Sequence, residues 1–372
     1  MKNWIIATRN KFFHFSYINV LKPYYFRKDP EDVHDRMTQV GQFLGRFWLT
    51  RSVTSLFFNF GHPSLEQTIL GIRFRNPVGL AAGFDKDALM VDILPSVGFG
   101  FEEVGSITGE PCMGNPKPRL WRLKKSKSLV VYYGLKNDGS EAIATRLSKK
   151  KFRFPVGTSI AKTNSPDTVE VQAGINDYVK AFSQFVDIGA YFTINISCPN
   201  AFGGEPFTDP DRLEKLLTAI DKVATNKPVF LKLSPDLTED QLSKILDISA
   251  KHRVHGFVST NLTKNRNNKK IIDEDVPING GISGNVVRDL SNEQIRFIYN
   301  KTKGNYVIIG VGGIASAEDA YEKIISGASL LQLITGMIFE GPGLVSEINQ
   351  GLTRLLKKNG FKNIREAVGT KK

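Results

Sequence analysis

Short apolar runs alternate with amphipathic stretches along most of the chain. From residue 72 onward, runs rich in β-branched and aromatic residues recur, and most of them end in glycine or a polar residue. Such runs are typical of buried parallel strands. The predicted strands are Pro77–Ala81, Phe101–Gly105, Val156–Ile160, Tyr191–Ile196, Val229–Leu233, Gly256–Thr260, Tyr306–Gly310 and Leu330–Ile334.

Helical patterns lie between most of these strands. The clearest are Arg212–Val223, Glu239–Lys251, Asn292–Lys301 and Ala317–Ser326. Eight strands alternating with helices over about 300 residues predict an α/β fold, a (β/α)8 TIM barrel with insertions. A doubly wound sheet is the alternative. No Gly-x-Gly-x-x-Gly follows the first strand and opens a helix, which disfavours a dinucleotide-binding fold.

Residues 1–65 precede the repeating pattern and differ from it. The first 28 residues contain six basic side chains and no acidic one, interleaved with aromatics. This mixture is typical of a helix lying in a membrane interface, and a plain helical decoration on the barrel is the alternative. Asp29 followed by Pro30 predicts a helix start capped by Asp29. We therefore expect a small N-terminal helical segment over 1–65 and a catalytic barrel over 66–372.

Composition narrows the possible partners. The net charge of +13 suits an anionic substrate, an anionic cofactor, an acidic membrane surface or nucleic acid. Nucleic acid is the weakest of these, because no nucleic-acid-binding motif is present. The two cysteines, Cys112 and Cys198, are too few for a disulfide framework and favour a reducing compartment. No apolar run approaches the length of a bilayer-spanning helix, and no metal site is expected.

The stretch from Asn195 to Asn200 is the strongest candidate for chemistry. Two carboxamides flank Cys198 and Pro199 directly after a predicted strand, and a glycine-rich loop follows. Carboxamides can read a planar ring that bears amides, and a thiolate can accept a proton from carbon. A buried structural cysteine is the alternative. We expect the cationic rim, Lys86 and the glycine loop to lower the pKa of the Cys198 thiol.

In a barrel of this kind the carboxyl ends of the strands carry the site. Two lysines, three asparagines and two glycine-rich turns fall at these ends. Backbone N–H groups in the turn Gly310–Gly313, together with a helix start at 314–316, would form an anion nest. The set predicts a phosphorylated cofactor beside an anionic substrate that bears amides.

Five segments also carry a resemblance to a known family. They are Asn76–Lys86, Gly114–Leu123, Asn195–Asn200, Lys232–Leu237 and Ile308–Ile314. These segments resemble dihydroorotate dehydrogenases, and residues 23–34 resemble the membrane-associated, quinone-dependent class 2. The resemblance implies an FMN barrel preceded by two helices that form a quinone tunnel. It also implies oxidation of (S)-dihydroorotate to orotate in pyrimidine (UMP) biosynthesis.

The resemblance assigns roles by position. Cys198 would be the catalytic base, assisted by Lys86, and the quinone tunnel would include Arg122 and Asn19. The substrate would contact Lys86, Asn195, Asn200 and Asn261. The flavin would be bound by Ala82, Gly83, Lys86, Ser106, Ser159, Asn195, Lys232, Thr260, Gly284, Gly312, Gly313, Thr335 and Gly336. The implied location is a peripheral position on the cytoplasmic face of a bacterial inner membrane, or alternatively on the mitochondrial inner membrane.

The chain departs from the class 2 pattern at several positions. Cys198 stands where class 2 normally has serine and the soluble class 1 has cysteine. Val131 replaces a substrate-binding asparagine, Leu262 a hydroxyl residue, Ser159 a flavin-side asparagine and Ile334 a tyrosine. A paralogous FMN oxidoreductase acting on another cyclic amide or acid is therefore an alternative function. A flavin-free barrel or membrane scaffold is a third.

Overall fold

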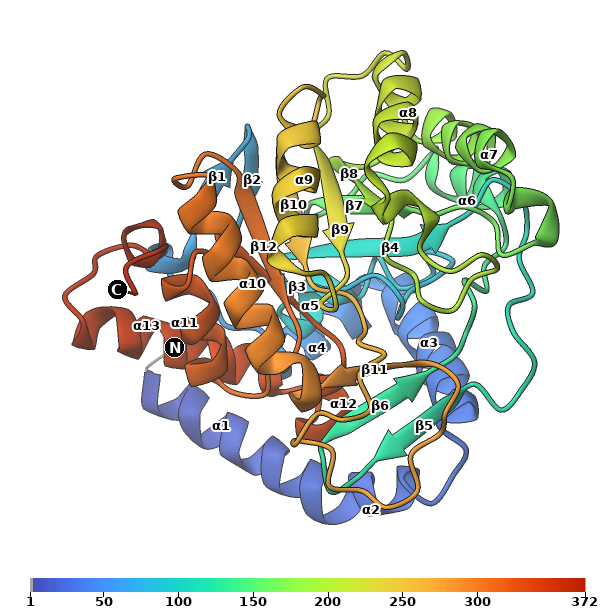
Figure 1. The fold of residues 1–372 in the computed structure, drawn as a ribbon. Helices are drawn as coiled ribbons and strands as arrows, with labels where there is room; N and C mark the ends of the chain where they lie inside the picture. The colour runs from blue at the N-terminus through green and yellow to red at the C-terminus, as the bar shows by residue number, and fades with distance from the viewer. Residues whose placement is uncertain (1–2, 372) are drawn as a thin grey trace.

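A computed structural model describes residues 3–371 of the chain. Its centre is a closed barrel of eight parallel strands, as the sequence pattern predicts (Figure 1). Around the barrel the order is β10-β12-β13-β3-β4-β7-β8-β9. The strands are β3 Val78–Leu80, β4 Phe101–Ile107, β7 Val156–Ile160, β8 Tyr191–Asn195, β9 Val229–Leu233, β10 Gly256–Ser259, β12 Val307–Val311 and β13 Leu330–Leu333.

Helices follow the barrel strands and cover them from outside (Figure 1). They are α5 Leu94–Val97, α6 Ser140–Leu147, α7 Val171–Gln184, α8 Pro210–Asp221, α9 Glu239–Ser249, α10 Arg288–Lys301, α11 Ala317–Ile325, α12 Thr335–Glu340 and α13 Leu344–Lys358. The four helices predicted from the sequence are confirmed with shifted ends. The largest shift is in α10, which begins at Arg288 rather than Asn292.

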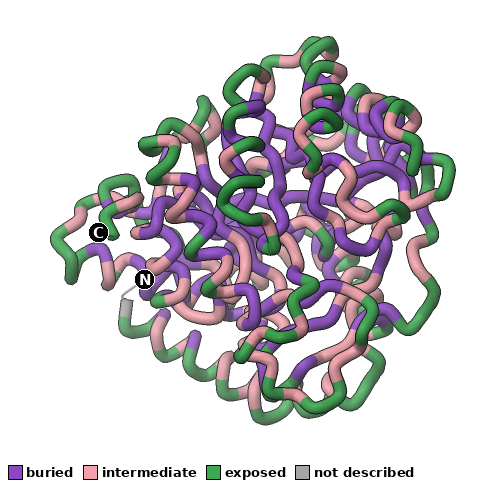
Figure 2. The backbone as a smooth tube through the Cα atoms, in the orientation of Figure 1, coloured by how far each residue is buried: buried purple, intermediate pink, exposed green. Residues whose placement is uncertain are grey.

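The barrel interior changes from apolar to polar along its axis. Aromatic and aliphatic side chains, among them Tyr191, close the amino-terminal end. Side chains alternate along a strand, so Tyr191, Thr193 and Asn195 of β8 all face inward. Thr193 donates to the buried Glu103 at 2.8 Å, and Asn195 donates to Ser106 at 2.8 Å. One strand thus carries an aromatic ring to the closed end and a carboxamide to the open rim, within the buried centre of the molecule (Figure 2).

Four α-helices and a π-helical turn precede the barrel. They are α1 Asn3–Ser16, the π turn Tyr17–Leu21, α2 Lys22–Tyr25, α3 Pro30–Arg46 and α4 Trp48–Phe58. The predicted cap is confirmed, since the Asp29 carboxylate accepts from the N–H groups of Glu31 and Asp32. The resemblance implies two helices before the barrel, and the structure has more helical segments than that in this region. The segment α1 to α2 lies along the edge of the barrel next to α13 (Figure 1).

Buried polar contacts fasten α3 to the barrel. Glu31 is 2% exposed, and both of its oxygens lie 3.0 Å from Nε of Arg119, whose Nη2 is 2.7 Å from Oε1. Arg119 also donates to the carbonyl of Asn115 at 3.0 Å. The Asn115 amide in turn donates to the carbonyl of Asn200 at 3.0 Å. A continuous chain of contacts therefore joins α3 to the Asn195–Asn200 stretch.

Two small sheets complete the fold, and the sequence reading did not anticipate either. β1 Gln67–Ile69 and β2 Ile72–Phe74 form a hairpin before the first barrel strand. β5 Leu120–Leu123, β6 Ser128–Val131 and β11 Gly281–Gly284 form a sheet in the order β11-β6-β5. The second sheet matters for function because it brings the ends of β6 and β11 to the barrel mouth.

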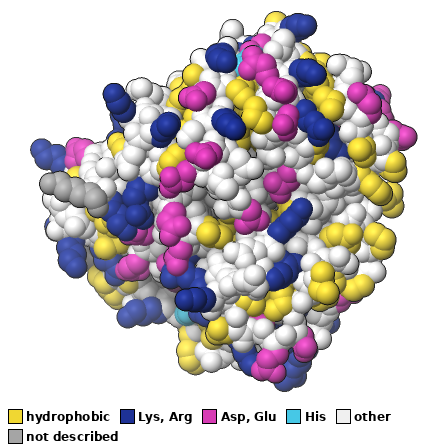
Figure 3. Space-filling view, in the orientation of Figure 1, with side chains coloured by type: hydrophobic (Ala, Val, Ile, Leu, Met, Phe, Trp, Pro, Cys, Tyr) yellow, Lys and Arg dark blue, Asp and Glu magenta, His cyan; other side chains and the backbone are white. Residues whose placement is uncertain are grey.

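The excess of basic residues is spread over the surface. Figure 3 shows Lys and Arg side chains mixed with Asp and Glu across the face in view. Some exposed cations have acidic neighbours, as in the pairs Lys125–Glu274 and Arg73–Glu66. The face in view therefore carries no single continuous basic surface.

Candidate functional site

A cavity of about 540 Å³ lies over the carboxyl ends of the strands. It brings together most of the residues that the sequence singled out. Those that line it are Ala82, Gly83, Lys86, Ser106, Arg122, Asn195, Cys198, Asn200, Lys232, Thr260, Asn261, Gly284, Gly312, Gly313, Thr335 and Gly336. They come from all parts of the barrel sequence, so only the closed parallel topology makes them neighbours.

Hydrogen bonds fix the carboxamides at the rim. Asn195 pairs in register with Lys232 on the neighbouring strand β9. Asn261 donates to the carbonyl of Ser197 at 2.8 Å and to Oδ1 of Asn195 at 3.2 Å. Asn200 donates to the carbonyl of Val131 at 2.9 Å. Amides held in this way are positioned before a ligand arrives, which reduces the ordering cost of binding.

The electrostatics of Cys198 correct one expectation. Burial raises the pKa of the Cys198 thiol to about 11, and Glu205 raises it too, against lowering contributions from the Asn200 N–H, Lys232 and Lys162. The expectation that nearby cations lower this pKa is wrong, because the desolvation of a thiolate outweighs them. Among the cations, the main lowering contributions thus come from Lys232 and Lys162 rather than from Lys86.

Two lysines present positive charge to the cavity. Burial lowers the pKa of Lys86 to about 8 and also lowers that of Lys232, which is 4% exposed. Lys86 Nζ lies 3.9 Å from the centre of the Tyr133 ring. Within residues 3–371, neither ammonium makes a hydrogen bond or a salt bridge. Buried cations without anionic partners are suited to bind anionic groups of ligands.

Glycines form a cradle on the other side of the cavity. Gly284, Gly312 and Gly313 have φ angles of +90°, +114° and +69°. A Cβ atom on Gly336 would stand 1.9 Å from the carbonyl oxygen of Ile314. Only glycine fits such a backbone. Because glycine has no side chain, a phosphate can come close to the main-chain N–H groups at these positions. The residues present therefore fit a phosphate-bearing cofactor.

Part of the expected anion nest is already used within the protein. The N–H of Ala315 donates to Asp319 at 3.1 Å, and Ser316 caps α11 by accepting from the N–H of Asp319. Neither Ala315 nor Ser316 lines the cavity. Of the predicted helix start at 314–316, only Ile314 lines the cavity, so the prediction is corrected for Ala315 and Ser316. The cradle consists of Gly284, Gly312, Gly313 and the first two residues of α12, Thr335 and Gly336.

Two assigned residues do not line the cavity. Ser159 is fully buried behind Ser106, with 2.8 Å between the two hydroxyl oxygens. It supports Ser106, whose hydroxyl accepts a hydrogen bond from Asn195, and it does not itself reach the cavity. Asn19 is exposed, and its amide donates to the carbonyl of Phe15 one turn earlier. The placement of Asn19 in the tunnel is therefore corrected, and Tyr17 lines the cavity instead.

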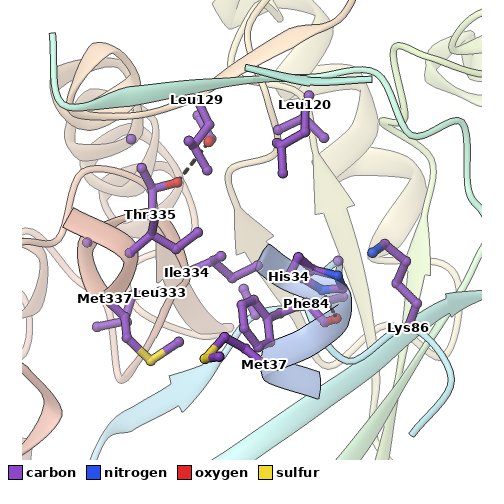
Figure 4. Close-up of a pocket in the computed structure, with 18 of the residues that line it drawn as sticks. His34, Met37, Phe84, Lys86, Leu120, Leu129, Leu333, Ile334, Thr335 and Met337 are labelled. Carbon is purple, nitrogen blue, oxygen red and sulfur yellow. Dashed lines mark hydrogen bonds between the residues drawn. The ribbon is translucent and has the colours of Figure 1, made fainter. Parts of the chain in front are cut away.

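The cavity continues into an apolar half that the sequence reading located only in outline. Figure 4 shows His34 and Met37 of α3 near Phe84, Ile334 and Met337. The other apolar residues of this half include Leu21, Val33, Val40, Leu44, Phe58, Met90, Ile93 and Ile338. The spacing of 33, 37, 40 and 44 on α3 was the available signal for a helix face turned toward an apolar space.

Polar groups are sparse in this apolar half. The Arg122 guanidinium donates to the carbonyl of Lys28 at 2.8 Å and lies 4.7 Å from the ring centre of Phe26. The Tyr17 hydroxyl donates to the carbonyl of Ile338 at 2.6 Å. His34 Nε2 lies 2.8 Å from the carbonyl oxygen of Phe84. The space suits an apolar ligand with a few polar atoms near Arg122.

Together these features suit a barrel enzyme that binds a phosphate-bearing cofactor, an anionic substrate and an apolar ligand in one cavity. Comparison with known proteins gives the family. The family model described as dihydroorotate dehydrogenase matches residues 64–356. A protein of Gloeobacter violaceus named dihydroorotate dehydrogenase (quinone) is 37% identical over 353 residues, covering 94% of this chain and 97% of that protein.

Two further comparisons agree. A protein of Nostoc punctiforme with the same name is 39% identical over 358 residues, covering 92% of this chain and 94% of that protein. The crystal structure of DHODH in complex with ferulenol from Eimeria tenella superimposes with a TM-score of 0.82 at 28% identity, covering 92% of this chain and 95% of that one. The chain belongs to the dihydroorotate dehydrogenase family.

Proposed function

We propose that the protein is an FMN-dependent enzyme that oxidises (S)-dihydroorotate to orotate and passes the electrons to a quinone. The observation that carries this proposal is the continuity of the cavity. A polar half with unpaired lysines and a glycine cradle opens into an apolar half lined by α3. Family membership and the quinone-linked names of the relatives support the same activity.

The residues of the polar half divide the work. We assign the substrate carboxylate to Lys86 and the ring amides to Asn195, Asn200 and Asn261. Cys198 in its thiolate form accepts the proton from C5 of the substrate, so that a C–H bond breaks and an S–H bond forms. FMN, when bound, supplies the acceptor for the hydride that leaves C6. The enclosed carboxamides orient the ring and keep water from the reacting atoms.

The flavin-holding residues follow from the fit described above. Gly284, Gly312, Gly313 and the first two residues of α12, Thr335 and Gly336, would hold the phosphate. Lys232 would place its positive charge beside the ring, where it stabilises negative charge on a reduced flavin. The remaining flavin contacts would come from Ala82, Gly83, Ser106 and Thr260, all of which line the same cavity.

A related FMN oxidoreductase with another cyclic substrate is the second candidate. Val131 and Leu262 both line the cavity and replace polar residues expected from the resemblance. Asn200 compensates only in part, because its amide is bonded to the Val131 carbonyl. An apolar wall at this place would suit a ring that lacks one of the amides of dihydroorotate, since an unpaired amide costs about 1–3 kcal/mol.

We further propose that residues 1–65 form the quinone-tunnel segment, that 66–372 form the catalytic barrel, and that the segment rests on a membrane surface. Of the large hydrophobic side chains that are exposed, most belong to α1–α4 and the turn between α1 and α2. They are Trp4, Ile5, Phe12, Phe15, Val20, Leu21, Tyr24, Val40, Phe43, Phe47, Trp48, Leu49, Val53, Leu56 and Phe57. An apolar surface of this kind marks an interaction site. Among residues 3–371, no helix is long and apolar enough to cross a membrane.

One experiment tests the proposed function directly. The purified protein is loaded with FMN and mixed with (S)-dihydroorotate without oxygen. The flavin absorption should bleach, and a short-chain quinone should restore it. Bleaching without restoration would contradict the quinone step. A loaded protein that dihydroorotate does not bleach, although dithionite does, would favour the second candidate.

A further inference from the structure

A second, much smaller cavity lies next to Cys198. Its volume is about 10 Å³, roughly the space that one water molecule needs. Cys198 and Asn195 line both this cavity and the main one. The other residues around it include Lys162, Tyr178 and Phe207. The Cys198 thiol therefore stands between the substrate space and a pocket that contains a lysine.

Lys162 is a buried cation with neutral hydrogen-bond partners. It follows β7 and is 3% exposed. Its ammonium donates to the carbonyl of Phe202 at 2.8 Å and lies 3.4 Å from the hydroxyl oxygen of Thr168. Among residues 3–371 it forms no salt bridge. Asp177, the nearest acidic influence, already accepts hydrogen bonds from Thr163 and from the N–H of Gly109.

Burying an ammonium without a counter-ion is costly, so such a group is rarely retained without a role. The role has to come from an anion that forms near Lys162. The thiol of Cys198 borders the same small cavity and would become that anion on ionisation. The hydrogen bond to the Phe202 carbonyl holds the lysine in place and ties it to the loop that follows Asn200.

Resting on the function proposed above, we propose that Lys162 is a positioning residue whose ammonium is the counter-charge for the Cys198 thiolate. Lys162 keeps its proton throughout and transfers none. It stabilises the ionised form of the base before the substrate C–H bond breaks. The hydrogen bond from Lys162 to the Phe202 carbonyl also anchors the glycine-rich loop beside the base, so that the positions of the charge and of the loop depend on each other.

Four other groups bear on the ionisation of Cys198. Lys232 of β9 favours the thiolate, but its charge is shared with Glu103 in the barrel interior. Glu205 of the following loop opposes the thiolate. The Tyr178 hydroxyl of α7 donates to the carbonyl of Asn195 at 2.8 Å and remains neutral, since burial raises its pKa. The N–H of Asn200 favours the thiolate. Lys162 is thus a second cation beside Lys232 that favours the thiolate, and it is the one that shares the small cavity with Cys198.

The test measures thiol ionisation without dihydroorotate or quinone. The rate constant for alkylation of Cys198 by iodoacetamide is measured from pH 7 to about pH 9.5, below the thiol pKa of about 11, in FMN-loaded protein with a Cys112→Ser background. Lys162→Gln retains a donor for the Phe202 carbonyl and removes the charge. Lys162→Met removes both. Lys227→Met is the control, because Lys227 is a half-buried lysine that also donates to carbonyls, at 3.0 and 2.7 Å, and does not line either cavity.

We expect both Lys162 variants to lower the alkylation rate constant about tenfold at each pH in this range, which corresponds to a rise of about one unit in the thiol pKa. Lys227→Met and Lys162→Arg should keep the wild-type rate constant. If Lys162→Met fails to fold, Lys162→Gln decides alone. An unchanged rate constant in folded Lys162→Gln would overturn the proposal. Because no substrate is used, this outcome is independent of whether dihydroorotate bleaches the flavin.

Discussion

The two halves of the main cavity are built on different principles. The polar half consists of strand ends, where a few residues such as Asn195, Lys232 and Asn261 are held by specific hydrogen bonds and strand register. The apolar half consists of helix faces and loops, where many side chains share one property and no single contact dominates. A reaction requires particular atoms at fixed positions in the polar half, whereas binding of an apolar ligand requires only a matching shape and the exclusion of water from the apolar half. A single substitution should therefore act strongly in the first and weakly in the second, unless it introduces a charge.

The sharpest test of the polar half is removal of the base. Cys198→Ala should slow flavin reduction by dihydroorotate by about 10²–10⁴-fold, the range that general bases contribute. In the unmodified protein the rate should keep rising from pH 7 toward pH 10, because burial raises the thiol pKa to about 11 and the thiolate is the active form. Stopped-flow bleaching across pH measures both. Cys198→Ala with a normal rate and profile would remove Cys198 from the mechanism.

Lys86 tests the reading of the substrate as an anion. Lys86→Met should weaken orotate binding roughly 10- to 100-fold near pH 7, because a hydrogen bond to a charged group contributes about 1.5–3 kcal/mol. Burial lowers the Lys86 pKa to about 8, so the unmodified protein should lose affinity as pH rises through 8 while the variant does not. Titration of FMN-loaded protein with orotate gives both values. Lys124→Met, an exposed lysine outside the cavity, is the control.

A charge placed in the apolar half should affect flavin reoxidation without affecting flavin reduction. Met37 of α3 lines the cavity, so Met37→Glu would bury a carboxylate among apolar side chains, which is strongly unfavourable. We expect reoxidation by a quinone to slow about tenfold while bleaching by dihydroorotate stays normal. Gln39→Glu adds the same charge to an exposed position on the same helix and should change neither rate. Equal loss of both rates in Met37→Glu would mean that the halves do not act separately.

The smallest effect concerns substrate choice. Val131→Asn adds a carboxamide to the wall of the polar half. If dihydroorotate is the substrate, one extra neutral hydrogen bond of about 1 kcal/mol should lower the KM roughly fivefold. Steady-state kinetics of the two proteins suffice. A higher KM in the variant would instead favour a substrate whose ring meets Val131 through an apolar edge.

The same contrast explains what could be predicted from the sequence. The barrel was predictable because buried parallel strands leave a local signature, and most of the rim residues followed because topology places every strand end at one face. The apolar half was harder to predict from the sequence. Its residues belong to several segments, and nothing local in Asn19 distinguishes an exposed helix position from the cavity-lining Tyr17 two residues earlier.

The remaining corrections share a physical cause. Ser159 faces the barrel interior as its position in β7 requires, but Ser106 stands in front of it. Ala315 and Ser316 stand at a helix start as expected, but the Ala315 N–H and the Ser316 hydroxyl both donate hydrogen bonds to the Asp319 carboxylate. The ionisation of Cys198 depends on how much water surrounds it, which is a property of the whole fold. Competition between neighbours in space is what the sequence alone does not reveal.

The buried Glu31–Arg119 pair has a practical consequence for engineering. Removing α3 in order to obtain a shorter, more soluble protein would also remove Glu31 and leave Arg119 without its carboxylate partner. Because Arg119 contacts the Asn115 carbonyl and the Asn115 amide contacts the Asn200 carbonyl, the position of the Asn200 backbone would also be affected. Trimming that stops before Asp29 keeps both the pair and the helix cap, so the helix that lines the apolar half of the cavity is also part of the frame that holds Asn200.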